Sequence, residues 1–418
     1  GAAPGWIGSR AEPREVLHSE SRLATESRPR KRLRRTLVAG EVAVSVVLLL
    51  LTGLVTASLM RLMRVDRGFD AESILTATVA LPSHAYADQN PRTAFYRQVL
   101  DRLGRLPGAE HAALISKPPL GGDFWIDMAR ATGDARPFMQ LPTEHFRWIS
   151  PGYFGTIHLP LTAGRDLSPS DEGKRDALVS ELTARTLWPG QNAVGRQFTR
   201  GGSDEPPFTV IGVVRNARTI SLSAPDPMMV YVPYWYRCDN TGSILVRTRQ
   251  DPASVADAVR RAIWSVNPAV SVPVVRTLGG VVADSVANRR FEMDLLLLFA
   301  TTALLLAGLG VYGVVAYSVA QRRREIGLRL TLGAQRANIY RLVLRDGLAP
   351  VALGAMAGIA IGFASARAVA SLLFETSPYN PAVIGCATVL LAVVGAAACL
   401  IPARQAAAVE PMQALRAE

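Results

Sequence analysis

Four long apolar runs are the feature that most limits what this sequence can fold into. About 20 apolar residues in a helix cross the hydrocarbon core of a bilayer, and each run is at least that long. Four nearly charge-free helices of this length are a poor fit to the core of one soluble domain. The sequence therefore predicts four transmembrane helices, at residues 37–60, 293–320, 347–374 and 382–402, with one large polar segment at 61–292.

Basic residues gather beside these runs. Residues 1–36 hold nine Lys or Arg against four acids, and residues 321–345 hold seven against one. Positive charge next to a span marks the cytoplasmic side of a membrane, so the net charge of +12 predicts topology and not nucleic-acid binding. We expect the segments 1–36, 321–346 and 403–418 in the cytoplasm, and the segment 61–292 and the short loop 375–381 outside it.

The large segment contains a split internal repeat. A β-branched run at 74–81, a helix starting at Asn90-Pro91 and a strand at 110–115 are followed much later by the same order of elements. The second copy consists of a strand at 244–248, a helix starting at Asp251-Pro252 and a strand at 270–275. Two such units predict a ferredoxin-like α/β layer, with a strand-rich insert at 120–240. The predicted fold class is thus a membrane α-helical protein with an α/β domain.

Residues that could carry chemistry are scattered along the large segment. Asp123 and Asp127 could form a carboxylate pair, but Gly and Pro around them predict a solvated loop. Neither Ser150 nor Ser180 lies in the GxSxG pattern of a serine hydrolase. The sequence therefore predicts no enzyme, no metal and no cofactor. The other residues without catalytic, redox or metal-ligand spacing are His84, His111, His145, His158, Cys238, Cys386 and Cys399.

Residues 190–197 imitate a nucleotide-binding loop. Gly190, Gly195 and Arg196 occupy the positions of the P-loop pattern GxxxxGK. Arg196 replaces the lysine, however, and Gln197 replaces the hydroxyl residue that binds magnesium. We interpret this stretch as a turn and expect the chain not to hydrolyse ATP by itself.

Small residues recur in two of the predicted spans. Gly354, Gly358 and Gly362 follow one another at four-residue spacing, and Gly308 and Gly313 lie in the second span. Such residues let helix backbones approach closely, which predicts packing within a bundle or against a second copy. Charged residues are nearly absent from the span centres, which disfavours an ion-coupled transporter. The exceptions, Glu41 and Arg367, lie nearer the span ends and can snorkel.

Residues 321–336 combine Ile326, Leu330 and Leu332 with several arginines, which predicts an amphipathic surface at the membrane face. Glu325 and Arg329 are one helical turn apart, a spacing that supports a short helix. The surface suits either a helix lying on lipid or a docking helix for a cytoplasmic partner. The basic run at 28–35 would likewise lie against anionic lipid headgroups.

Several motifs resemble those of one family, the MacB-type and FtsX-like permeases of ABC systems, and most closely its duplicated orphan permeases (ADOP). The resemblance runs from about residue 30 to the end of the chain. The motifs are SPGYFGTIHLPLTAGRDL (150–167), LWPGQNAVGRQF (187–198), FTVIGVVRNAR (208–218), REIGLRLTLGA (324–334), ASLLFETSPYNP (370–381) and IPARQAAAVEPMQALR (401–416).

This resemblance implies a multi-pass protein of the bacterial inner membrane, with both termini in the cytoplasm and a periplasmic core domain at 61–292. A separate ABC ATPase subunit would close on ATP, and the motion would reach the periplasmic domain to export an amphiphile, antibiotic or lipoprotein. The residues that match the coupling segment are Glu325, Ile326, Gly327, Arg329, Gly333 and Ala334.

The resemblance also raises alternatives. Duplicated relatives carry two four-helix halves, so this chain would be the C-terminal half of a longer protein or a half-permease that pairs with a second copy. A periplasmic adaptor is a further expected partner. FtsX-like relatives that regulate cell-wall hydrolases suggest a different function, that of a membrane-anchored scaffold without an ATP-driven cycle.

Overall fold

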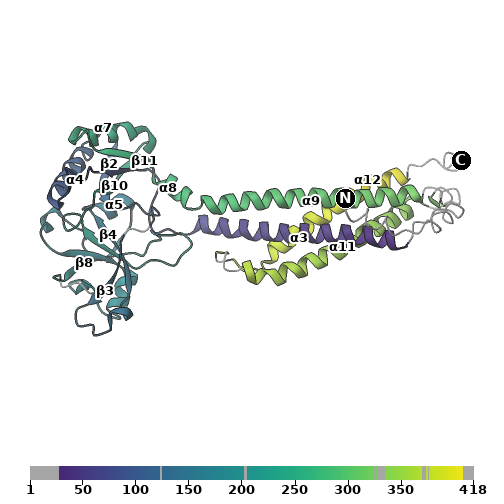
Figure 1. Ribbon diagram of the computed structural model, residues 1–418, viewed down its shortest axis with the longest axis horizontal. Helices are drawn as coiled ribbons and strands as arrows, with labels where there is room; N and C mark the ends of the chain where they lie inside the picture. The colour runs from purple at the N-terminus through teal and green to yellow at the C-terminus, as the bar shows by residue number, and fades with distance from the viewer. Residues whose placement is uncertain are drawn as a thin grey trace. The chain divides into compact units, whose positions relative to one another are not determined.

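A computed structural model describes residues 28–122, 125–201, 205–322, 325–326, 329, 335–369, 373–374 and 376–407. The chain divides into two compact units (Figure 1). The helical unit is formed by the two ends of the chain, up to Arg61 and from Phe291. The globular unit is Leu62–Arg290.

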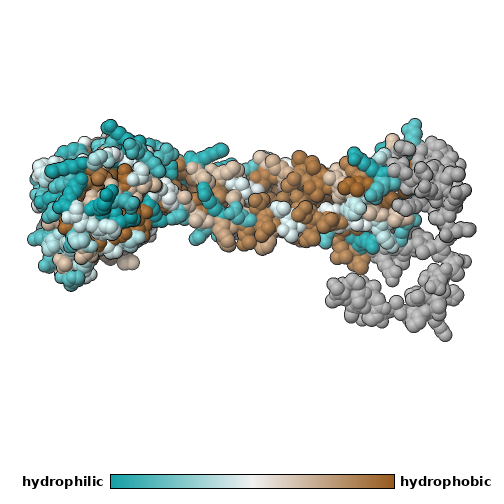
Figure 2. All heavy atoms as spheres, turned by 90° about the horizontal axis from the view of Figure 1, so that it is seen from above, coloured by the Kyte–Doolittle hydropathy of each residue, from teal (hydrophilic) through white to brown (hydrophobic). Residues whose placement is uncertain are grey.

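The helical unit contains four helices that are long and apolar enough to cross a membrane, which confirms that the four apolar runs form long helices. Figure 2 shows apolar side chains over much of their exposed surface. The helices extend beyond most ends of the apolar runs because polar end turns can leave the hydrocarbon. The third helix differs most: it begins at Arg336, well before the predicted start, and Leu373 and Phe374 at the predicted end are not helical. The helices are α3 (Arg28–Arg64), α9 (Ala287–Gln321), α11 (Arg336–Val369) and α12 (Pro381–Ala407).

Helix α3 contacts α9 through apolar and polar side chains. Ser45 is fully buried and donates its hydroxyl to the carbonyl of Ala303 at 2.9 Å, and Thr52 donates to the carbonyl of Leu296 at 3.2 Å. Such interhelical hydrogen bonds supplement close packing inside a bilayer. The buried apolar residues that these two helices contribute to the core of the bundle are Val38, Val42, Val46, Leu50, Ala307, Val311, Val315 and Val319.

The globular unit contains the predicted ferredoxin-like layer. Its four strands pair antiparallel in the order β11-β1-β10-β2, which joins the two halves of the split repeat. Helices α4 and α7 pack with the apolar core on one face, whereas the short helix α5 packs on β2 and β10. The bounds are β1 (Ile74–Ala80), α4 (Gln89–Leu103), β2 (Ala109–Ile115), α5 (Tyr153–Ile157), β10 (Thr241–Thr248), α7 (Ala256–Val266) and β11 (Ser271–Thr277).

The insert closes into a ring of strands, a feature that the sequence did not predict. The ring order is β4-β3-β7-β8-β6-β9, and β9 pairs in parallel with β4 to close it. Alternate residues fill its interior, among them Phe146, Trp148, Val230 and Val232. The bounds are β3 (Trp125–Ala131), β4 (Thr143–Ile149), β6 (Asp176–Ser180), β7 (Gln197–Arg200), β8 (Phe208–Val214) and β9 (Met229–Pro233), with β5 (Leu161–Gly164) beside β8 and α6 (Glu181–Leu187) after β6.

Two local predictions were wrong. The N-cap position of α4 is Asp88 and not Asn90, so the helix starts two residues earlier than the Asn-Pro pair suggested. Asp127 lies in strand β3 and not in a loop, because β3 pairs with β4 and β7. Asp123 lies outside the described residues. The P-loop imitation is a turn, as predicted, with Gly190 and Gly195 at positive φ.

Candidate functional site

Three of the predicted coupling residues are described, and they follow α9 in the chain: Glu325, Ile326 and Arg329. Ile326 is 3% exposed and packs in the apolar core with Val319 and Ile339. Its backbone N–H donates to the carbonyl of Arg322 at 2.9 Å, which continues the helical hydrogen bonding beyond α9. Ile326 therefore anchors this segment to the bundle. Gly327, Gly333 and Ala334, as well as Leu330 and Leu332, lie outside the described residues.

Glu325 and Arg329 flank the buried Ile326 in the chain but have exposed side chains. Their side chains pair at 2.6 Å and are 48% and 50% exposed. An exposed pair of this spacing contributes only about 0.3–0.5 kcal/mol to stability. The pair is therefore an exposed charged surface that does little to hold the segment together.

An ion cluster that the sequence did not predict supports the segment. Asp346 of α11 lies 3.5 Å from Arg35 of α3 and 3.1 Å from Arg322, which follows α9. Arg34 lies 4.1 Å above the ring of Tyr317 and adds a cation–π contact between α3 and α9. The cluster joins three helices at the point from which the coupling segment leaves the bundle. The sequence signal was Asp346 itself, an acid among the many arginines of this region.

The three regularly spaced glycines of α11 all face α3. A Cβ built on Gly358 would lie 2.7 Å from the carbonyl oxygen of Ala43 and 2.7 Å from the Cβ of Val46. Gly354 approaches Ala39 and Val42 in the same way. One turn further along, a Cβ at Gly362 would lie 2.7 Å from a methyl group of Leu50. The backbones of α3 and α11 can thus approach closely only where α11 lacks side chains.

The glycines of α9 behave differently. A Cβ on Gly308 would lie 3.2 Å from Val394 of α12, but one on Gly313 would meet nothing within 4 Å. Gly310, between them, faces Glu41, whose Oε2 would lie 2.5 Å from an added Cβ. The side chain of Arg367 lies outside the described residues. Among the described residues, Gly313 therefore has no packing partner, in contrast to Gly308, Gly354, Gly358 and Gly362.

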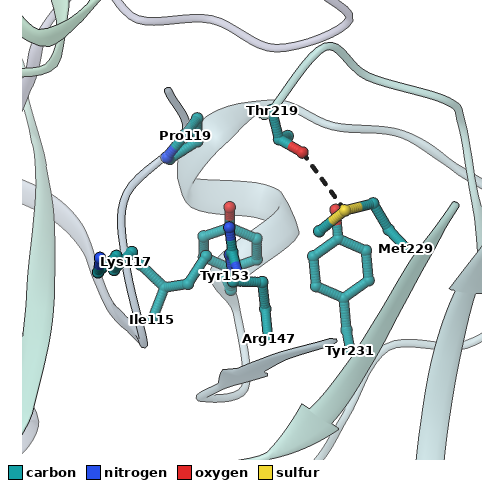
Figure 3. Close-up of a pocket in the computed structure, with 8 residues that line it drawn as sticks. All are labelled: Ile115, Lys117, Pro119, Arg147, Tyr153, Thr219, Met229 and Tyr231. Carbon is teal, nitrogen blue, oxygen red and sulfur yellow. Dashed lines mark hydrogen bonds between the residues drawn. The ribbon is translucent and has the colours of Figure 1, made fainter. Parts of the chain in front are cut away.

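A small depression in the globular unit, drawn in Figure 3, lies next to strands β4 and β9. Tyr153 and Tyr231 are fully buried beside it, and burial raises the pKa of both well above the usual tyrosine range. Thr219 Oγ1 donates to Met229 Sδ at 3.6 Å across it. The depression has no room for a water molecule, so we interpret it as tight packing between α5 and the ring.

A buried carboxylate lies inside the ring of strands. Glu144 of β4 is fully buried, and its Oε2 accepts a hydrogen bond of 2.6 Å from Thr183 Oγ1 of α6. Its Oε1 has no hydrogen-bond partner among the described residues. Burial raises the pKa of Glu144 to about 7, although the Thr183 bond lowers it in part. The sequence signal was its position two residues before Phe146, on the same face of the strand.

The other candidate residues do not come together in one site. Among the described residues, no three His, Cys, Asp or Glu side chains gather as a metal site would require. His158 lies 3.6 Å from Asp70, and Asp127 lies 3.5 Å from Arg200. Ser180 caps α6 by accepting from the backbone of Thr183, which is a structural role.

Four apolar helices and an α/β domain inserted after the first of them define an integral membrane protein of the permease class. The MacB-like periplasmic core domain family matches residues 38–262, more than half of the chain, and the FtsX-like permease C-terminal family matches residues 297–411. The chain therefore belongs to the MacB-type, FtsX-like family of ABC transporter permeases, as the sequence motifs suggested.

Known relatives cover parts of this chain. The macrolide export ATP-binding/permease protein MacB of Azoarcus sp. (strain BH72) is 30% identical over 279 residues, 62% of this chain and 40% of that protein. The ABC transporter permease YknZ of Bacillus subtilis (strain 168) is 26% identical over 280 residues, 65% of this chain and 69% of that protein. The periplasmic region of MacB from Actinobacillus actinomycetemcomitans aligns with a TM-score of 0.35 and 14% identity, covering 53% of this chain and 95% of that structure. The chain thus spans about 40% of the length of the MacB relative.

Proposed function

We propose that this chain is the permease part of an ABC-type exporter that carries the motion of a cytoplasmic ATPase subunit to the core domain on the other side of the membrane. The observation that carries the proposal is the arrangement at Ile326. An apolar anchor buried in the bundle holds an exposed Glu325–Arg329 pair directly beyond a cluster that joins three helices. A partner that pushes on this pair would therefore move α3, α9 and α11 together.

The cargo that fits this proposal is an amphiphile, antibiotic or lipopeptide taken up on the core-domain side. Relatives are named for macrolide, syringafactin and pyoverdine export, which supports this class of cargo. The expected location is the bacterial inner membrane, with both termini and the coupling segment in the cytoplasm. A second copy or a second permease half would complete the transporter, and an adaptor would receive the cargo.

Reversing the charge of the exposed pair tests the coupling. In a Glu325→Lys variant, we expect stimulation of a co-expressed ABC ATPase to fall about tenfold or more. A partner surface that complements the negative charge of Glu325 is positive, so it would repel the lysine. Membrane insertion should stay unchanged, since the pair contributes little to stability. The measurement is ATP hydrolysis by the reconstituted complex.

A matched control is available in the globular unit. Glu181 and Arg185 form the same four-residue pair on α6, at 3.4 Å, so Glu181→Lys should leave ATP hydrolysis at the wild-type rate. Equal stimulation by wild type and Glu325→Lys would refute the docking role. If wild type itself neither stimulates nor co-purifies with an ATPase, the scaffold function would replace export.

A further inference from the structure

The short segment 65–73, which links α3 to strand β1, is bonded along its length to the rest of the globular unit. Two side chains of the segment, Phe69 and Ala71, are buried. Its backbone also joins distant elements: Arg67 accepts from the N–H of Arg218 at 3.0 Å, and Ser73 accepts from the N–H of Thr248 at 2.8 Å. The first of these partners follows β8 of the ring, and the second ends β10 of the ferredoxin-like layer. The linker thus touches both parts of the unit.

Gly68 lets the linker lie directly on the segment after β8. Its φ is +80°, and an added Cβ would lie 2.6 Å from the carbonyl oxygen of Asn216 and 2.9 Å from Ala217. A side chain at this position would therefore be strained and would collide with backbone. The backbone of the linker is therefore packed directly against the backbone of the segment that follows β8.

Asp70 joins the linker to the layer and to α5. Its carboxylate accepts from Arg247 of β10 at 2.9 Å, and its N–H donates to the carbonyl of Ile157 at 2.9 Å. Arg247 is 4% exposed and also donates, through Nε, to the carbonyl of Thr156 at 2.7 Å. A buried guanidinium bonded in two directions fixes the relative positions of its partners. Linker, layer and α5 therefore meet at Arg247.

Helix α5 connects these contacts to the ring, because its aromatic side chains pack against β9. Tyr153 and Phe154 lie 6.1 and 5.0 Å, between ring centroids, from Tyr231 of β9. Figure 3 shows Tyr153 and Tyr231 lining the same packed depression. The layer and the ring also meet directly where β2 pairs with β4 at Ile115 and Ile149, flanked by backbone hydrogen bonds of 3.0 Å from Ser116 to Trp148 and from Ser150 to Leu114. The α5 packing is thus a second link between the two parts, beside the strand ladder.

The second connection to the helical unit touches less of the globular unit. Helix α8 (Leu278–Ser285) follows β11, the edge strand of the layer, and packs against β1 and β11. Its cap, Thr277, accepts from the N–H of Gly280 at 3.0 Å. A displacement of α9 would therefore enter the layer at its edge, whereas a displacement of α3 would enter where the layer, α5 and the ring meet.

We propose that residues 65–73 are the input element of the globular unit, with Asp70 and Arg247 as the pair that positions it. Displacement of α3 moves the linker, and the linker moves the layer through Arg247 and the ring through Gly68 and α5. This inference rests on the proposed export function for its purpose, but the bonding that it describes can be tested separately.

Asp70→Asn in the full chain, reconstituted in nanodiscs, tests the junction by hydrogen–deuterium exchange. Asp70, Arg218 and Thr248 each donate a backbone N–H in the junction. We expect exchange in all three segments to become about tenfold faster, because opening of one contact releases the others. Asp257→Asn is the matched control. Asp257 pairs with Arg260 at 2.9 Å within α7 and is 84% exposed, so its loss should leave the Asp70, Arg218 and Thr248 segments unchanged.

Gly68→Ala gives a second variant that does not depend on charge. Gly173→Ala is its control, since Gly173 has a similar φ of +85° but nothing within 4 Å of an added Cβ. Only Gly68→Ala should speed exchange at Arg218. Faster exchange confined to the linker, in both Asp70→Asn and Gly68→Ala, would overturn the proposal.

An export assay separates this proposal from the proposed function. With a partner ATPase, Asp70→Asn should retain ATPase stimulation and lose export, because the coupling segment is intact while the input to the globular unit is not. Export at the wild-type rate, despite faster exchange, would overturn the input role. Absence of ATPase stimulation by wild type would refute the export function alone, and the exchange data would still decide whether the junction acts as one unit.

Discussion

Replacing Glu144 with glutamine is expected to remove a pH dependence from the stability of the globular unit. The pKa of Glu144 is about 7 in the folded protein, against an ordinary value of 4.5. Below pH 4.5 the carboxyl is protonated in both the folded and the unfolded chain, so its burial carries no charge penalty. Between pH 4.5 and 7 the unfolded chain loses its proton first, and the free energy of unfolding falls as pH rises.

The size of this effect follows from the shift. The difference between the two pKa values corresponds to about 3 kcal/mol, which wild type should lose between pH 4.5 and pH 8. Glutamine has the same shape and no charge, so the Glu144→Gln variant should lack this slope. The measurement is urea unfolding of the full chain in detergent at several pH values, followed by tryptophan fluorescence.

Glu205 provides a control of opposite sign. Hydrogen bonds from Tyr236 and Arg175 lower its pKa to about 2, so its contribution to stability is present above pH 4.5 and is lost as pH falls toward 2. Because Glu205 is partly exposed, solvent screens the effect and it should be smaller. Glu205→Gln should therefore change the profile only in acid. An unchanged neutral-pH slope in Glu144→Gln would show that another group carries it.

The sequence predicted the ferredoxin-like layer because its signals are local. Each half of the repeat shows a strand, a helix start and a second strand within about 40 residues, and adjacent pairing follows from such units. Closure of the ring could not be predicted in this way. It depends on the register between β4 and β9, in which Phe146 pairs with Val230. Nothing in either strand alone specifies that partner.

The candidate site shows the same division. The helical spacing of Glu325 and Arg329 predicted their pairing, and an apolar Ile326 between them predicted opposite faces. The cluster of Asp346 with Arg35 and Arg322 was missed, because it forms only when three helices meet. Asp127 was misplaced since strand pairing overrides the local preference of Gly and Pro for turns.

Glycine spacing also predicted less than the structure specifies. It correctly indicated that Gly354, Gly358 and Gly362 share one face of a helix, but spacing does not say which helix covers that face. The partner is α3, whose Ala39 and Ala43 present backbone carbonyls to the glycines. Gly313 is also a glycine in a membrane-type helix, but an added Cβ there meets nothing within 4 Å in the part of the chain that the structure describes.

Because Gly358 is packed against α3 and Gly313 is not, we expect a second result: Gly358→Val should lose the close contact between α3 and α11. A Cβ added at this position would lie 2.7 Å from the carbonyl oxygen of Ala43 and 2.7 Å from the Cβ of Val46. The two methyl groups of valine need still more space. The neighbouring atoms are backbone and a β-branched side chain, which cannot move aside independently of helix α3. Overpacking of this kind costs about 1–3 kcal/mol, and more where backbone must shift.

The measurement is the thermal unfolding of purified protein in detergent, together with its yield in membranes. Gly313→Val is the matched control, because it introduces the same side chain where nothing lies within 4 Å. It should unfold at the wild-type temperature, whereas Gly358→Val should unfold several degrees lower, by about 2–4 °C per kcal/mol for a domain of roughly 150–250 residues. If both variants were destabilised equally, valine in a membrane helix would be the cause, and close approach of α3 would not explain the glycine at position 358. If Gly313→Val alone were destabilised, the open face of α9 would be the surface that contacts a second copy or permease half.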